Sequence, residues 1–251
     1  QDWEREASLR LRDGDPDVVL DYDAKGRIVE AGTRDQAIAA AAKAAAADRV
    51  AGRSTLIVTG TNADAAHAAT AVREHLVDLG LVSETCVVLG RDGTTAGVGD
   101  LVQARRIDRD LGLTNRETYT VTGHRDDGGL DAVSSRTGRP VVIPAGYVEQ
   151  HLTLGYAGTA HAAQGATLDT CHALIGPELD TAVAYVALTR GRDSNTAWTI
   201  TDTGDPAQPP VSGAAVLSGL LVREDDDLDA SAVEVTGRDS ERRGSAAGLV
   251  G

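Results

Sequence analysis

The chain has no Met, no Phe and only 3% aromatic residues among its 251 positions, and its two cysteines, Cys86 and Cys171, stand far apart. No Cys and His spacing is typical of zinc or of a disulfide framework, so we expect reduced thiols and no metal site. No apolar run reaches about 18 residues and no signal-peptide pattern opens the chain, which predicts a cytoplasmic protein without a membrane segment. Because it starts at Gln1 without any Met, we expect a piece of a longer protein.

Lysine is almost absent, and its two occurrences, Lys25 and Lys43, follow Ala24 and Ala42. A phosphate-binding P-loop requires G-K-[ST], so the sequence contains none. It also lacks G-x-S-x-G and a paired Cys and His, which leaves an unrelated hydrolase without support.

The formal net charge of −14 argues against a protein that binds nucleic acid by bulk electrostatic attraction. A local basic cleft stays open as an interpretation. Arginine supplies 22 of the 24 basic residues, which suits phosphate contacts of fixed geometry, although a GC-rich coding bias explains the same preference.

Alternating strand and helix patterns predict an α/β fold. Thr33 is a candidate cap for a helix that runs to Val50, residues 54–59 form a buried-strand pattern, and residues 65–79 form a helix closed by Gly80. Short runs between Gly90 and Gly146 predict a small β module, with strands at 100–104, 118–122, 130–133 and 140–143.

Two polar signatures stand about 20 residues apart. In the first, Thr159, His161 and Gln164 emerge within six positions from a loop rich in Ala and Gly, a setting that suits polar contact with phosphate or sugar. In the second, Ala182, Tyr185, Val186 and Thr189 predict one apolar helix face, whose last turn presents Thr189 and Arg190 to a neighbouring group.

The segments T-x-H-x-x-Q-G (159–165) and V-A-L-T-R (186–190) resemble the last two helicase motifs of the RecD-like branch of superfamily 1. The neighbouring residues resemble the helicase region of a MobF-type conjugative relaxase, which nicks and unwinds plasmid DNA for transfer between cells. The resemblance implies a second RecA-like motor domain at 31–90 and 147–201, split by an SH3-like β insertion at 91–146. Residues 1–30 would then be a linker from a missing first motor domain, and residues 202–251 a flexible acidic tail that contains one short helix at 211–222.

The resemblance also implies roles for individual residues. Arg190 corresponds to the arginine finger that reaches the γ-phosphate of ATP, and ATP with Mg²⁺ would be held mainly by the upstream ATPase domain, so that the chain alone is inactive. Gln164, Gly165, Thr189 and Arg192 would lie beside the nucleotide. Single-stranded DNA would be contacted by a larger set: Thr61, Asn62, Thr159, His161, Arg105 and Arg106.

Each assignment has an alternative. Thr61 or Asn62 is an equally good cap of its own helix, Arg190 a basic residue favoured at a helix C-terminus, and His161 a satisfied loop histidine. Arg105 and Arg106, with Arg109 and Arg116, form either a phosphate-binding cluster or a solvated loop with internal ion pairs. Many relatives have a basic residue where this chain has Ala162, so a vestigial, non-catalytic DNA-binding or scaffolding module is the alternative function.

Overall fold

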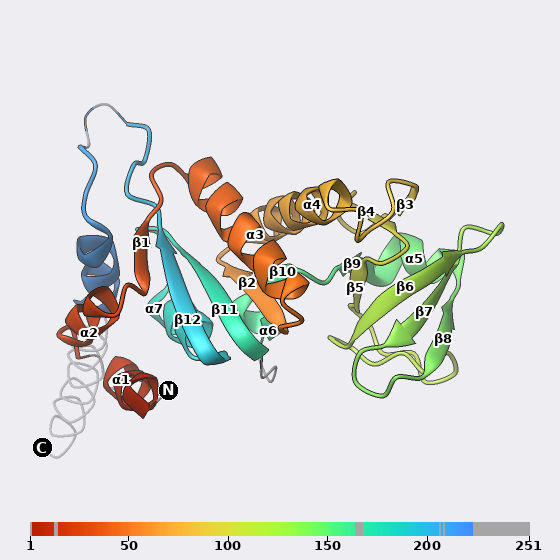
Figure 1. Cartoon of the computed structure of the whole chain (residues 1–251), viewed down its shortest axis with the longest axis horizontal. Helices are drawn as coiled ribbons and strands as arrows, with labels where there is room; N and C mark the ends of the chain where they lie inside the picture. Colours follow the sequence, from red (N-terminus) through yellow and green to blue (C-terminus); the bar gives the residue numbers. More distant parts are fainter. Residues whose placement is uncertain (1, 13–14, 164–167, 206, 208, 223–251) are drawn as a thin grey trace, which may run out of the picture.

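The computed structural model describes residues 2–12, 15–163, 168–205, 207 and 209–222. Figure 1 shows an α/β body beside an antiparallel β module that projects to one side. The acidic segment beyond residue 222 lies outside the described residues, so its predicted flexibility stays a prediction. None of the described helices is long and apolar enough to cross a membrane.

The α/β body is built on a five-stranded parallel sheet with the order β1-β12-β11-β2-β10. Buried runs rich in β-branched and aliphatic residues form its central strands, as expected for a sheet covered on both faces. The strands are β1 (Ile28–Glu30), β2 (Thr55–Thr59), β10 (Ala157–Thr159), β11 (Leu168–Ile175) and β12 (Gly191–Thr199). The predicted α/β fold is thereby confirmed.

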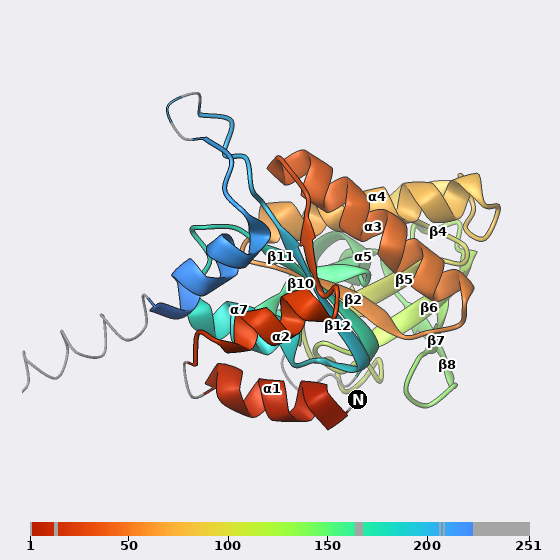
Figure 2. The ribbon, with the colours of Figure 1, turned by 60° about the vertical axis from the view of Figure 1, so that its left-hand side comes forward.

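Helices cover both faces of this sheet (Figure 2). Successive side chains of β2 point to opposite faces of the sheet and so pack into two clusters of buried side chains. Ile57 packs in one cluster, and Leu56 and Val58 pack in the other. The Ile57 face is covered by α3 (Arg34–Val50) and α4 (Asn62–Asp78). The opposite face is covered by α1 (Asp2–Arg12), α2 (Val18–Ala24), α7 (Thr181–Leu188) and the helical residues 213–222.

The β module predicted between Gly90 and Gly146 is present as a five-stranded antiparallel sheet with the order β8-β7-β6-β5-β9. Its strands are β5 (Leu101–Ala104), β6 (Thr118–His124), β7 (Leu130–Ser134), β8 (Pro140–Ile143) and β9 (Leu152–Leu154), with α5 (Ala145–His151) between the last two. We call residues 101–154 the β insertion. Its likeness to an SH3 fold stays a prediction.

Residues 1–30 contain α1 and α2, which pack on the α/β body, and β1, which pairs with β12. Their origin as a linker from another motor domain stays a prediction. A short hairpin of β3 (Cys86–Val88) and β4 (Thr95–Gly97) lies outside the parallel sheet. The structure differs from the sequence expectations at the predicted tail. Residues 213–222 pack their apolar side chains onto the body, so the expected tail does not begin at 202.

The buried face of α7 also differs from the expected one. Ala184, Ala187 and Leu188 are buried, whereas Ala182 is exposed. Every residue of this short helix except the first is apolar or aromatic, so its sequence carries no periodic contrast by which the buried face could be chosen.

Candidate functional site

The parallel sheet distributes the predicted site residues over two opposite edges. β2 and β10 end side by side at Thr59 and Thr159, so Asn62 and His161 follow at the carboxyl edge. Arg190 immediately precedes β12 and therefore lies at the amino edge. Asn62 and His161, expected to contact DNA, therefore lie at the opposite ends of the parallel strands from Arg190, expected near the nucleotide. Their spacing in the sequence could not show this.

Arg190 is held by the main chain of its own helix. Its Nε donates to the carbonyl oxygen of Val186 at 3.1 Å, and its Nη2 donates to Thr189 Oγ1 at 3.4 Å. Within the described part of the chain, no carboxylate forms an ion pair with Arg190. The half-buried guanidinium is consequently oriented and retains its charge for an anion.

The strand that follows the first signature, β11, begins beside Arg190. The amide of Leu168, the first described residue after the T-x-H-x-x-Q-G segment, donates to the carbonyl oxygen of Arg190 at 3.3 Å. Leu168 also aligns with Gly191 in the parallel register. Gln164 and Gly165 themselves lie outside the described residues, so their place near a nucleotide stays a prediction.

The other two residues expected near the nucleotide already have protein partners. Thr189 donates its hydroxyl to the carbonyl oxygen of Tyr185 at 2.8 Å, one helical turn earlier. Arg192 is exposed and pairs with Asp169, whose carboxylate also accepts from Ser54. Thr189 therefore closes the helix, and Arg192 is partly neutralised before any ligand arrives.

At the carboxyl edge, Thr61 caps α4. Its hydroxyl accepts from the Asp64 amide at 3.0 Å and donates to the Asp64 carboxylate at 2.9 Å. The structure shows no protein acceptor, among the residues it describes, for the amides of Asn62 and Ala63 in the same first turn. Exposed amides at a helix N-terminus attract phosphate groups. The amides of Asn62 and Ala63 are therefore available to an anion, whereas the Thr61 hydroxyl is already bonded to Asp64.

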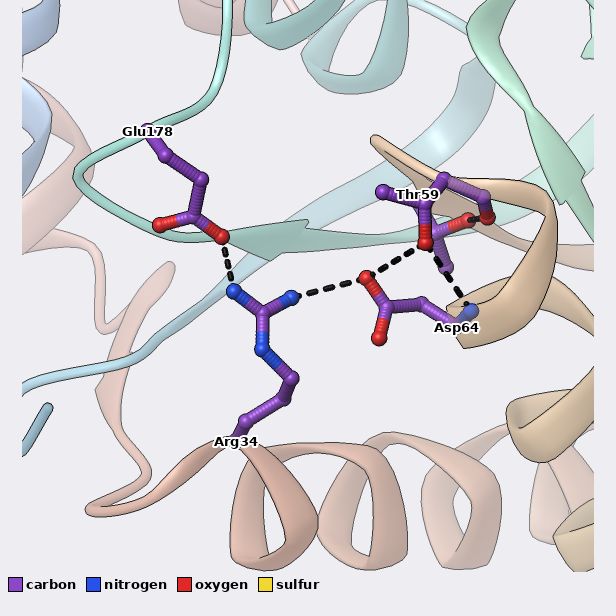
Figure 3. A network of polar contacts seen from close by, with 5 residues as sticks. Arg34, Thr59, Asp64 and Glu178 are labelled. Carbon is purple, nitrogen blue, oxygen red and sulfur yellow. Dashed lines mark hydrogen bonds and ion pairs between the residues drawn. The ribbon is translucent and has the colours of Figure 1, made fainter. Parts of the chain in front are cut away.

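An ion-pair network lies beside this helix start (Figure 3). Arg34, the first residue of α3, donates to Asp64 Oδ2 at 2.7 Å and also pairs with Glu178. Sequence reasoning did not single out Arg34, because it lies about 30 residues before the T-N segment. The network ties the starts of α3 and α4 to the loop after β11.

A groove of about 640 Å³ separates the α/β body from the β insertion, and we call it the interdomain groove. Asn62 on α4 and Gly158 on β10 line one side, and Arg105 and Thr153 of the β insertion line the other. Arg91, in the turn between β3 and β4, lines it as well. Of the six residues expected to contact DNA, Asn62 and Arg105 are brought together here.

Arg105 is the more buried of the two arginines that line the groove. Its guanidinium donates to Gln103 Oε1 at 2.9 Å, and the described residues offer it no carboxylate in an ion pair. Burial, reinforced by the like charges of Arg91 and Arg116, lowers the pKa of Arg105. An arginine stays protonated nevertheless, so Arg91 and Arg105 offer two cations to an anionic ligand, beside the carboxylates of Asp92 and Glu149 that also line the groove.

The remaining predicted contacts lie near the groove but do not line it. Arg106 contacts the ring of His151, 3.2 Å from Nη1 to Nε2, and His151 lines the groove. Thr159 is half-buried and His161 is exposed at the end of β10, and neither side chain has a hydrogen bond among the described residues. Arg91 and His151 escaped sequence analysis because neither stands within a recognisable motif.

No protein-family model matches the chain. It is 31% identical over 195 residues to the conjugal transfer protein TraA of Agrobacterium fabrum, covering 77% of this chain and 18% of TraA. It is 33% identical over 133 residues to the multifunctional conjugation protein TraI of Escherichia coli K12, covering 47% of this chain and 7% of TraI. The chain therefore spans less than a fifth of either relative.

Among solved structures, the Pif1 helicase from Candida albicans matches 92% of this chain and 58% of its own, with a TM-score of 0.50 and 15% identity. At that identity the likeness concerns the fold, and it confirms a RecA-like α/β body. In sequence the chain is thus similar to parts of proteins named for conjugal DNA transfer, and in fold it is similar to the Pif1 helicase.

Proposed function

We propose that this chain is the second motor half of an ATP-dependent DNA helicase or translocase within a larger conjugation protein. The observation that carries the proposal is the separation of functions across one sheet. An oriented arginine without an ion pair among the described residues lies at the amino edge, and a groove lined by Arg91, Arg105 and Asn62 lies toward the carboxyl edge. In a motor, the nucleotide site and the DNA site must lie on one rigid element, so that a structural change at the nucleotide moves the residues that contact DNA.

At the amino edge, Arg190 would reach the γ-phosphate of an ATP bound mainly by an upstream ATPase domain, together with Mg²⁺. A guanidinium there neutralises the charge that spreads over the phosphoryl oxygens in the transition state, a contribution of about 10³–10⁵ in rate. The bonds from Nε to Val186 and from Nη2 to Thr189 orient the guanidinium, and Nη1 has no protein partner among the described residues. Gln164, Gly165, Thr189 and Arg192 would complete the surroundings of the nucleotide.

In the interdomain groove, single-stranded DNA would lie with phosphates against the amides of Asn62 and Ala63 and against Arg105. Arg91 would add a further cation from the β3–β4 turn. Thr159 and His161 would contact the strand where it leaves the groove along the carboxyl edge. With a net charge of −14 the chain would rely on these individual contacts and not on bulk attraction, because Asp92 and Glu149 in the groove lining offset the charges of Arg91 and Arg105.

Eight residues, 160–167, connect the two sites in the sequence. The chain leaves the carboxyl edge at Thr159, passes α6 (Ala160–Ala163) and enters the amino edge at Leu168, next to Arg190. A movement of Arg190 toward a nucleotide would therefore be transmitted to the end of β10. This short connection supports a coupling role for the T-x-H-x-x-Q-G segment.

A vestigial DNA-binding or scaffolding module is the second candidate. Ala162, at the position where the family resemblance implies a basic residue, is buried and has no polar side-chain group to offer a ligand. The test is ATP hydrolysis, with and without single-stranded DNA, by the longest natural protein that carries this chain. Hydrolysis stimulated by DNA supports the motor. DNA binding without hydrolysis supports the vestigial module, and absence of both contradicts both proposals.

A further inference from the structure

The chain passes between the α/β body and the β insertion twice, and both crossings meet at one buried carboxylate. The outgoing crossing ends at Asp100, directly before β5, and the returning crossing runs through Tyr156, directly before β10. Asp100 is fully buried. A buried charge persists only where partners satisfy it, so the groups around Asp100 show what holds the two parts together.

Three donors surround the Asp100 carboxylate. Arg73 of α4 donates from Nε at 2.8 Å, the Gly97 amide donates at 2.7 Å, and the Tyr156 hydroxyl donates at 2.8 Å. Arg73 also donates from Nη2 to the carbonyl oxygen of Ser83 at 2.7 Å. We call Arg73, Asp100 and Tyr156 the joint.

Tyr156 ties the joint to both parts of the molecule. Its hydroxyl accepts from the Leu101 amide of the β insertion at 3.0 Å, and its carbonyl oxygen accepts from the Ile57 amide of β2 at 3.0 Å. The guanidinium of Arg49 on α3 lies 5.3 Å from the centre of its ring. One residue thus connects α3, β2, β5 and the buried carboxylate, the link to β2 being made by its main chain.

The joint lies between the two walls of the interdomain groove. One wall is carried by α4, the helix that bears Arg73, and the other by β9 and the residue after β5, Arg105. A rotation of the β insertion about the two crossings would change the distance between these walls. Hydrogen bonds buried at the crossings oppose that rotation because leaving one of their polar groups unpaired is costly.

We infer that Asp100 and Tyr156 are positioning residues which hold the two walls of the interdomain groove at the spacing that admits a single nucleic-acid strand. This inference rests on the proposed strand-binding function. It adds that affinity for the strand depends on groups that never touch it. The β insertion and the α/β body then move as one unit, and any hinge of the motor lies elsewhere.

The mildest informative change is Tyr156→Phe, which removes the shared hydroxyl and keeps the ring against Arg49 and the ion pair of Arg73 with Asp100. Tyr119→Phe is the matched control, because Tyr119 is equally buried and its hydroxyl accepts from the Thr114 amide inside the β insertion. Spin labels at Lys43→Cys and Arg139→Cys, both exposed, in a Cys86→Ser background report the distance between the two parts.

We expect one narrow distance distribution in the parent and in Tyr119→Phe, and a broadened one in Tyr156→Phe. Affinity for an oligothymidylate strand should fall about tenfold in Tyr156→Phe alone, as when about a tenth of the molecules keep a competent groove. An unchanged distribution with unchanged affinity overturns the inference. If the parent itself does not bind the strand, the proposed function fails, while the distance measurement still decides whether the joint is rigid.

Should Tyr156→Phe fail to fold, hydrogen exchange of the unaltered chain tests the same point. The Leu101 and Gly97 amides should exchange as slowly as the Ile57 amide of the central sheet, because all three would open only with the core. Fast exchange at Leu101 and Gly97 beside slow exchange at Ile57 would show a loose joint and overturn the inference.

Discussion

The Nε of Arg190 donates to the carbonyl oxygen of Val186, 3.1 Å away in the last turn of α7. Together with the bond from Nη2 to Thr189 Oγ1, it orients the guanidinium and leaves Nη1 without a protein partner among the described residues, available to an anion. A lysine cannot reproduce this arrangement. Its single ammonium group lacks the planar set of N–H donors with which an arginine can bond the helix on one side and an anion on the other. The relationship gives Arg190 a geometry that differs from that of an ordinary solvated arginine.

Replacing Arg105 should weaken strand binding in a salt-dependent way. For Arg105→Ala we expect a lower affinity for single-stranded DNA, and a plot of log K against log salt whose slope is smaller by about 0.7, the value for one lost phosphate contact. Fluorescence anisotropy of a labelled oligonucleotide across a salt series measures both. Arg139→Ala is the control, since Arg139 is an exposed arginine of the β insertion that does not line the groove. Equal slopes for Arg105→Ala and the unaltered chain would remove Arg105 from the DNA interface.

Thr61 should matter for stability more than for DNA. Its hydroxyl is engaged twice by Asp64, so Thr61→Ala removes the cap of α4 and should lower the free energy of unfolding by about 1 kcal/mol. Thr61→Ser keeps the capping oxygen and should restore most of that loss. Urea unfolding monitored by circular dichroism provides the values. A normal stability of Thr61→Ala combined with weak DNA binding would instead assign the hydroxyl to the strand.

Asp48 should make stability depend on pH in the acidic range. Burial alone would raise its pKa, but hydrogen bonds from His172 at 3.1 Å and Thr170 at 2.5 Å, with the charge of Arg53, outweigh burial and lower it. Trp198 donates its indole N–H to Nδ1 of His172, so the proton of that ring lies on Nε2 and faces Asp48. The carboxylate therefore stabilises the fold at any pH above its ordinary pKa of 3.8, and this contribution is lost as the pH falls through the lower folded value.

The corresponding variant is Asp48→Ala, which leaves two buried donors unpaired. Its free energy of unfolding at pH 7 should be lower by about 1–3 kcal/mol, and the gap to the unaltered chain should narrow as the pH falls below 3.8. Asp126→Ala, at an exposed turn, serves as the control with no comparable gap. A gap that stays constant down to the acid range would show that the carboxylate is not ionised in the fold.

Much of the α/β body could be predicted because its elements carry local signals. The cap at Thr33, the apolar run before Thr59 and the glycine after α4 each act within a few residues of the boundary that they mark. The buried face of α7 could not be predicted, because the chemistry of its side chains barely varies around the helix. Local patterns decide boundaries, whereas packing decides which face is covered.

The candidate site divides in the same way. Arg190 stands within a recognisable segment, and its residue type already indicates a phosphate contact. By contrast, the engagement of Thr61 with Asp64 and of Arg192 with Asp169 depends on neighbours that only the folded chain brings close. The joint around Asp100 was equally invisible, because its three side chains stand 27 and 56 positions apart in sequence.

The most direct measurement is DNA-stimulated ATP hydrolysis by the longest natural protein that carries this chain, comparing Arg190→Ala with Arg139→Ala. Arg139 is the control, since it is an exposed arginine of the β insertion with no part in either proposed site. We expect Arg190→Ala to lower kcat about 10³-fold or more while nucleotide binding persists, and Arg139→Ala to change kcat far less. Equal activity of Arg190→Ala and the unaltered protein would contradict the account.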